Sequence, residues 1–250
     1  LLLLSLLLSF SCNNNSNYYN GMISSAHPIA SKIGLDILKN GGNAFDAAIA
    51  VHFALSVVYP NAGNIGGGGF LVYRLNNGDI GTLDFREKAP EKSYRDMYID
   101  SIEGELKVDD KRSKIGHLAS GVPGSVDGMV KIYDKFSTVD WIDLLEPSIK
   151  VAREGFGVTE KQAKGLNNVK KSLVSANDHP IPFIKEDPWK VGDILTQKNL
   201  ANTLEEIKKS KRDGFYKGAV AELIINEMDS GGGIITQSDL DNYSSLWREP

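Results

Sequence analysis

Arg86 is the side chain in this sequence best placed to bind a ligand, because it follows a strand-like run at the point where the chain leaves a sheet. The run "IGTLDF" at 80–85 has strand composition, and "REK" follows it directly. A sheet holds such residues rigidly, while the adjoining loop keeps them accessible. Arg86 also lies between Asp84 and Glu87, and an arginine with such neighbours is more often half of an ion pair than a ligand clamp. The residues alone leave both roles open.

Four consecutive glycines, Gly66, Gly67, Gly68 and Gly69, precede the strand-like run "FLVYRL". Adjacent glycines carry a large conformational-entropy cost on folding, so such a run needs a physical reason. The glycines lack the Lys-Ser/Thr pair of a phosphate loop and the GxGxxG spacing, and they follow a helix-like segment rather than a strand. The pattern therefore argues against nucleotide binding. It predicts either close approach of another chain segment or a site where a ligand approaches the main chain.

The histidines and the cysteine offer little for metal chemistry. His52 lies in an apolar, helix-like segment with no second histidine or cysteine at ligand spacing, which favours a core histidine over a metal ligand. His27, His117 and His179 are equally isolated, and neither an HExxH nor a paired-cysteine pattern occurs. The residues therefore predict no metal site.

Composition describes an ordinary globular protein with no nucleic-acid partner. The 250 residues are 41% hydrophobic and 24% charged, enough for a sizeable core. The formal charge of -4 and the pI near 5.6 give no basic footprint for nucleic acid. The one concentrated basic run, "KKSKR" at 208–212, is expected to be a solvated helix end.

The first twenty residues have the pattern of an export leader. "LLLLSLLLSFS" is too short for a membrane span but fits the apolar region of a secretory signal that lacks its Met and basic start. Cys12 follows, and this arrangement resembles a bacterial lipoprotein signal; an ordinary signal peptide is the alternative. We expect residues 1–20 to be a leader, and the protein to be exported, either to the periplasm or to a membrane through a lipid anchor on Cys12. With one cysteine, no disulfide forms within the chain.

Residues 21–250 read as a mixed α+β region. We expect a short first strand at 21–27, a helix that starts at Pro28 and stops at Gly41 and Gly42, and a helix buried on most faces at 43–59. "NNGD" predicts a hairpin between strands at 70–75 and 80–85. A glycine-rich turn should begin near residue 115 and be followed by two helices, the second with Trp141, Leu144, Leu145 and Ile149 at helical spacing. Further helices are expected at 160–173, 197–209 and 217–229, and a last short one capped by Thr236 or Ser238.

Five ordered motifs give the sequence a specific resemblance. "ILKNGGNAFDAAIAV", "NAGNIGGGGF", "DFREKAP", "HLASGVPGSVDGM" and "FYKGAVAE" together resemble the large-subunit portion of the γ-glutamyltranspeptidases, also called glutathione hydrolases. The likeness runs from about residue 21 to residue 250. It implies part of an αββα four-layer sandwich of the N-terminal-nucleophile hydrolase type. It also implies a precursor that cuts itself before a threonine, which then becomes the nucleophile.

The resemblance assigns roles to the candidates above. Arg86 matches the family arginine that holds the α-carboxylate of the γ-glutamyl group, and a guanidinium fork suits that task. The four glycines, with Glu87, would support the wall of the site rather than contact the ligand. The implied substrates are glutathione and other γ-glutamyl compounds, and the acceptor is water, an amino acid or a peptide. The implied partner is the small subunit of the same precursor, and no cofactor is required.

The sequence departs from the family pattern in its nucleophile. No threonine lies in a Thr-Thr-His-like context, so we expect the nucleophile downstream and this portion alone to be inactive. The threonines concerned are Thr82, Thr138, Thr159, Thr196, Thr203 and Thr236. Two alternatives stay open. One is a related acylase, such as a cephalosporin acylase or a poly-γ-glutamate depolymerase; the other is a non-catalytic surface lipoprotein that uses the fold as a binding module.

Overall fold

A computed structural model describes residues 21–102, 105–108 and 111–250; the expected leader and Cys12 therefore lie outside the described residues. The helices that it contains there are α1 (Pro28–Lys39), α2 (Ala44–Val58), α3 (Ser125–Phe136), α4 (Trp141–Glu154), α5 (Glu160–Ala176), α6 (Lys198–Ser210), α7 (Asp213–Tyr216), α8 (Gly218–Ser230) and α9 (Gln237–Asn242). The strands are β1 (Phe70–Arg74), β2 (Ile80–Asp84), β3 (Ile99–Ile102), β4 (Glu105–Val108), β5 (Phe156–Gly157), β6 (Ile194–Leu195) and β7 (Leu246–Arg248). The expected α+β class is confirmed.

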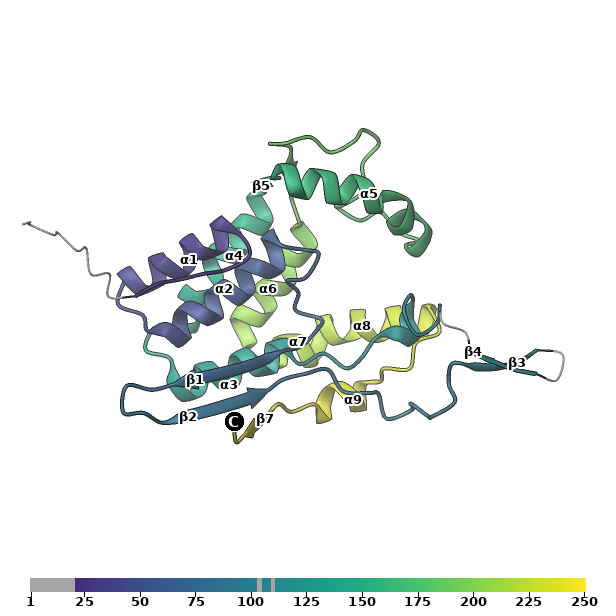
Figure 1. Ribbon diagram of the computed structural model, residues 1–250, viewed down its shortest axis with the longest axis horizontal. Coiled ribbons are helices and arrows are strands. Elements are labelled where there is room, and N and C mark those ends of the chain that lie inside the picture. Colours follow the sequence, from purple (N-terminus) through teal and green to yellow (C-terminus); the bar gives the residue numbers. More distant parts are fainter. Residues whose placement is uncertain (1–20, 103–104, 109–110) are drawn as a thin grey trace, which may run out of the picture.

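The core lies among helices stacked beside one small sheet. Helix α2 packs against α1 on one side and α4 on another, and α4 packs in turn on α6 (Figure 1). Along α2, Ile49, Ala50, Phe53 and Val57 are fully buried. The small alanines allow neighbouring helices to approach α2 closely. Because these helices bury α2 on most faces, its sequence is apolar almost all round.

Side chains at the helix ends explain where α1 and α2 begin and end. Pro28 occupies the first turn of α1, and Gly41 follows its end with φ 96°, a left-handed conformation that favours glycine. Asn43 caps α2 in a reciprocal capping box with Asp46. The strand expected at 21–27 is wrong. That segment instead serves the start of α1: the His27 Nδ1 accepts a hydrogen bond from the Ile29 N–H at 3.2 Å, and no strand partner runs beside it in the described chain.

The predicted hairpin forms two of the three strands of an antiparallel sheet with the order β1-β2-β7. Its turn is closed by Gly78, whose φ is 95°. In the register, Leu71 faces Leu83 and Leu83 faces Trp247, and these residues point to the helices. The pairs Phe70–Asp84 and Val72–Thr82 lie on the opposite face. That outer face is open: Phe70 is 64% exposed and Val72 is 70% exposed.

The later elements follow the sequence pattern, with several short additions. The two helices expected after the turn near residue 115 and those at 160–173, 197–209 and 217–229 are confirmed, and Thr236, not Ser238, caps α9 by accepting from the Asp239 N–H. The β3–β4 hairpin, the β5–β6 pair, the short helix α7 and β7 had no expectation. The hairpin extends away from the body of the molecule (Figure 1).

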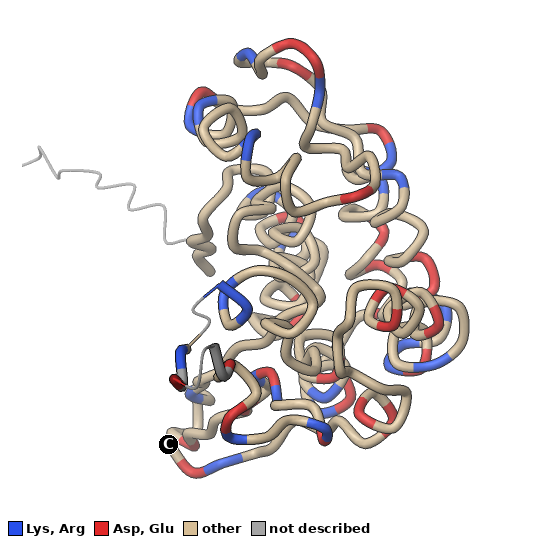
Figure 2. The backbone as a smooth tube through the Cα atoms, turned by 90° about the vertical axis from the view of Figure 1, so that its right-hand side faces the viewer, with Lys and Arg blue, Asp and Glu red and all other residues tan. Residues whose placement is uncertain are grey.

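Positive and negative charges are interspersed along the described chain. Basic and acidic segments alternate around the periphery (Figure 2). Within the described residues, no helix is long and apolar enough to cross a membrane.

Candidate functional site

The segment that carries Arg86 continues the sheet and then joins a neighbouring loop. Beyond β2, the Phe85 N–H donates to the Gly69 carbonyl at 3.0 Å, and the Gly69 N–H donates to the Phe85 carbonyl at 3.3 Å. Three residues later, Lys88 and Val122 exchange backbone hydrogen bonds of 3.2 and 2.8 Å. Arg86 therefore lies between two backbone ladders, which fix its position without using its side chain.

The Arg86 side chain is exposed and has one acidic neighbour. It is 61% exposed, its Nε lies 3.1 Å from Glu87 Oε2, and its guanidinium lies 5.8 Å from the centre of the Phe70 ring. None of the described residues accepts a hydrogen bond from its Nη atoms. Both roles that the residues left open are compatible with this geometry: an ion pair exists, and the end of the fork is free to donate to a carboxylate.

Asp84 orients the backbone of the same segment. Its Oδ1 accepts from the Arg86 N–H at 3.1 Å, and its Oδ2 accepts from Arg248 Nε at 2.8 Å. The hydrogen bond from the Arg86 N–H, assisted by Arg248, lowers the pKa of Asp84. Asp84 therefore stays ionised at neutral pH and links β2 to β7 beside Arg86.

Gly68 and Gly69 meet the segment 85–87 directly. A Cβ on Gly68 would lie 2.4 Å from the Phe85 carbonyl oxygen and 2.8 Å from Arg86 Cα, and one on Gly69 would lie 2.9 Å from the Phe85 ring. The Gly67 carbonyl accepts from the Gly124 and Ser125 N–H groups, at 2.7 and 3.0 Å. The expected close approach is present, with the Arg86 segment and the start of α3 as partners. Support of a bound ligand by these glycines stays a prediction.

Two glycines of α3 and its N-terminus complete this enclosure around Phe85. A Cβ on Gly124 would lie 2.1 Å from the Phe85 carbonyl oxygen, and one on Gly128 would lie 2.5 Å from the Phe85 ring. On the other side, the His52 ring lies 6.3 Å from the Phe85 ring, edge to face. Burial lowers the pKa of His52 to about 4, so the imidazole is neutral at physiological pH.

A buried polar network, missed from the sequence, anchors the Arg86 segment from below. The Tyr243 hydroxyl donates to the Arg86 carbonyl at 2.7 Å. Burial raises the pKa of Tyr243, so the phenol stays a donor at neutral pH. The Tyr243 ring stacks on Tyr216, whose hydroxyl donates to the Pro123 carbonyl at 2.8 Å. Through these contacts the end of the described chain holds the candidate site.

Asp127 and Arg212 form the charged centre of this network. Asp127 is 3% exposed; its Oδ1 accepts from Arg212 Nε at 2.9 Å and its Oδ2 accepts from Ser245 N–H and Oγ at 2.8 and 2.6 Å. Arg212 Nη2 also donates to the Tyr243 carbonyl at 2.7 Å. The expectation that 208–212 is a solvated helix end is thus wrong for Arg212, because this residue turns inward to pair with a buried carboxylate. Charge clustering alone gives no signal for such a pairing.

The other titratable side chains do not assemble a second centre. Within the described residues, no group of three or more histidine, cysteine or carboxylate side chains could hold a metal ion. His117 pairs with Glu227 at 2.8 Å, and His52 and His27 lie apart from it on α2 and at the start of α1.

Comparison with known proteins identifies the family. A family model described as "Gamma-glutamyltranspeptidase" matches residues 30–250. The chain belongs to the γ-glutamyltranspeptidase family. Among γ-glutamyltranspeptidases and their relatives, it is 44% identical over 232 residues to "Glutathione hydrolase proenzyme" of Escherichia coli (strain K12), covering 92% of this chain and 40% of that protein. The chain spans about 40% of the length of this curated relative.

Solved structures agree with this assignment. The "Crystal Structure of Helicobacter pylori gamma-Glutamyltranspeptidase" superposes with a TM-score of 0.88 at 45% identity, covering 92% of this chain and 66% of that one. Cephalosporin acylase from Bacillus halodurans superposes with a TM-score of 0.78 at 28% identity, covering 90% and 42%. The mixed α+β fold is thus shared by a γ-glutamyltranspeptidase and an acylase.

The contact between Gly68 and the Arg86 segment leads to a stability prediction. Gly68→Ala should lower the free energy of unfolding by about 2 kcal/mol, because the added Cβ meets backbone atoms that cannot move aside cheaply. Gly66→Ala is the matched control, since a Cβ there meets nothing within 4 Å; it should be neutral or stabilise by up to about 1 kcal/mol. Urea unfolding measures both, and equal effects of the two substitutions would contradict the packing argument.

Proposed function

We propose that the protein to which these residues belong is a self-processing γ-glutamyltransferase and glutathione hydrolase. Its substrates are glutathione and other γ-glutamyl compounds, with water, an amino acid or a peptide as the acceptor. The observation that carries the proposal is Arg86, an exposed guanidinium whose backbone is fixed by two ladders at the end of β2. The family membership and the 44% identity to a glutathione hydrolase proenzyme support it.

The proposed chemistry is acyl transfer in two steps. A threonine freed at the start of the small subunit would attack the γ-glutamyl amide with its hydroxyl, its own amine acting as the base. The acyl-enzyme would then pass to water or to the acceptor amine. In this scheme Arg86 binds the α-carboxylate through two charge-assisted hydrogen bonds and so orients the γ-amide. The nucleophile and the base lie in the small subunit. These residues alone are therefore expected to be inactive.

Turnover by the full reading frame tests the proposal, with Arg86 as the probe. The wild-type protein should split into two chains and release the anilide from a γ-glutamyl anilide. Arg86→Ala should split normally but raise KM about 10- to 150-fold, which corresponds to about 1.5–3 kcal/mol for hydrogen bonds to a charged group. Arg86→Lys should fall in between, because an ammonium keeps the charge without the fork.

Arg95→Ala supplies the matched control for loss of an exposed arginine. Its side chain is 95% exposed, so its KM should equal that of the wild type. An unchanged KM in Arg86→Ala would remove the substrate role from Arg86. Splitting without turnover would favour a related acylase, the alternative that the structural likeness to cephalosporin acylase supports. Neither splitting nor turnover would favour a non-catalytic binding module.

We also infer that the open face of the β1-β2-β7 sheet is an inner face of an αββα sandwich. Four apolar side chains support this: Phe70, Val72, Ile80 and Leu246 are 64, 70, 53 and 46% exposed, and the register places all four on the side away from the helices. A second sheet packed there would remove this apolar surface from water. A structure of the complete protein tests the inference, and a sheet left open to solvent would contradict it.

Export and lipid attachment to Cys12 are proposed on the leader pattern alone. An apolar run followed by the one cysteine supports them. The wild-type protein should fractionate with membranes, and Cys12→Ser should move it to the soluble periplasmic fraction. Identical fractionation of the two would contradict a lipid anchor.

A further inference from the structure

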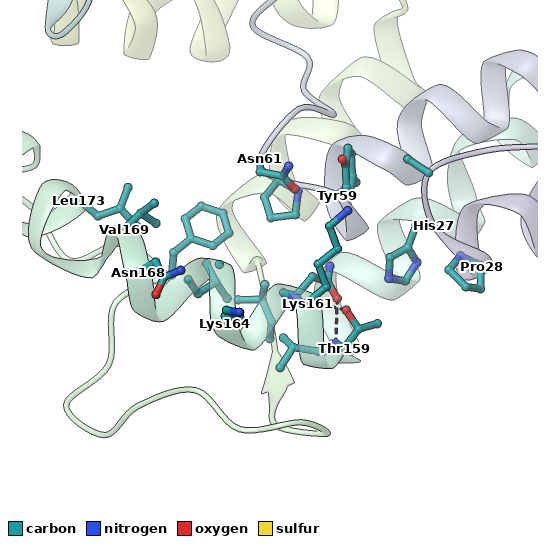
Figure 3. Close-up of a pocket in the computed structure, with 18 residues that line it drawn as sticks. His27, Pro28, Tyr59, Asn61, Thr159, Lys161, Lys164, Asn168, Val169 and Leu173 are labelled. Carbon is teal, nitrogen blue, oxygen red and sulfur yellow. Dashed lines mark hydrogen bonds between the residues drawn. The ribbon is translucent and has the colours of Figure 1, made fainter.

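A cavity of about 570 Å³ lies between α5, the start of α1 and the end of α2 (Figure 3), and α5 lies well away from β2 (Figure 1). Its size falls within the range of small-molecule sites. The floor is apolar and closed, since Val158 and Leu195 are 2% and 1% exposed. One wall carries Val169, Leu173 and Phe183, which belong to α5 and to the loop that follows it. The cavity therefore offers an apolar chamber that the proposed γ-glutamyl chemistry does not use.

One buried polar group in this cavity lacks a partner. His27 is 5% exposed, and its Nε2 forms no hydrogen bond with the described residues. Its Nδ1 accepts from the Ile29 N–H, so the proton of the neutral ring lies on Nε2. Burial lowers the pKa of His27, and the nearby Gln162 side chain partly offsets this, yet no hydrogen bond of acceptable geometry joins Gln162 to Nε2. The Gln162 Oε1 accepts from the Thr159 N–H at 2.9 Å, and its Nε2 donates to the Val58 carbonyl at 2.6 Å. A buried donor without a partner is costly, which points to a missing acceptor.

The charge around the cavity is of one sign. Lys161 and Lys164 line it, and neither forms an ion pair within the part of the chain that the structure describes. No aspartate or glutamate is among the lining residues. Figure 3 shows Lys161 extending from α5 toward Tyr59, with the His27 ring beside Lys161 and Thr159. Two ammonium groups and an imidazole N–H thus surround the same apolar space.

We propose that this cavity is a binding site for an amphipathic organic acid, with its carboxylate at His27 and Lys161 and its apolar body against Val169, Leu173 and Phe183. The carboxylate supplies the acceptor that His27 Nε2 lacks and the anion that the two lysines lack. The apolar body covers the hydrophobic wall of the chamber. Selectivity follows from the two ends together, because a neutral molecule of the same shape forms no ion pair with the exposed lysines.

Titration calorimetry on the full-length protein tests the site, with decanoate as the probe and decanol as its uncharged match. Decanoate should bind saturably at one site per chain, and decanol at least about tenfold more weakly. Lys161→Gln with Lys164→Gln should weaken decanoate binding at least about tenfold. Lys150→Gln with Lys171→Gln is the charge-matched control outside the cavity, and its affinity should stay within about twofold of the wild type.

Two further variants keep the test independent of the lysines. A Cβ on Gly165 meets nothing within 4 Å, so Gly165→Leu should fill the cavity, preserve α5 and abolish binding, whereas Gly165→Ala should retain most of it. His27→Asn keeps an oxygen to cap α1 but removes the Nε2 donor, and should weaken binding about tenfold.

Three results would overturn the proposal: no saturable binding of decanoate, equal binding of decanol, or affinities that are unchanged in both Gly165→Leu and the cavity lysine pair. Urea unfolding midpoints of each variant, measured alongside, confirm that lost binding reflects the cavity and not lost folding. Because the readout is binding, it is independent of γ-glutamyl turnover and of Arg86.

Discussion

The hydrogen bond from the Tyr243 hydroxyl to the Arg86 carbonyl joins two regions that lie 157 residues apart in sequence. The candidate site depends on it, because the Arg86 side chain is exposed and receives little support of its own. Tyr243 is in turn fixed by stacking on Tyr216 and by the Arg212 guanidinium, which binds its carbonyl. The position of one exposed arginine is thus determined by the two backbone ladders that flank it and by the groups buried beneath it.

Asp127 makes this arrangement cooperative. Its carboxylate accepts from Arg212 on one oxygen and from Ser245 on the other, so α3, the start of α7 and the approach to β7 share one buried charge. Removing one partner of such a pair typically costs about 3–5 kcal/mol, because the other charge is left buried without compensation. The network also connects the middle strand of the sheet with the last one, since Ser245 directly precedes β7. Disturbance at Asp127 is therefore transmitted to both sides of Arg86.

The sequence predicted local features well and long-range polar contacts poorly. Pro28, Gly41 and the "NNGD" turn act within a few residues, so their patterns identify α1 and the β1–β2 hairpin. The glycine run indicated a close approach, but not that its partners are the Phe85–Glu87 segment and the start of α3. Arg212 and Tyr243 gave no local signal, because each finds its partner far along the chain. Residues 21–27 have the composition of a strand but form none, because no neighbouring strand lies beside them in the described chain.

The ion pair between Arg86 and Glu87 also sets the electrostatic character of the surface at the end of β2. The two side chains neutralise each other, and Asp84 and Arg248 do the same beside them. An approaching anion therefore meets two arginines whose charges are already compensated, and long-range attraction toward these two side chains is weak. Discrimination there rests on contact geometry, on whether a ligand presents two oxygens to the free end of the guanidinium. Many anions can collide with such a surface, but only those whose two oxygens match the guanidinium stay bound.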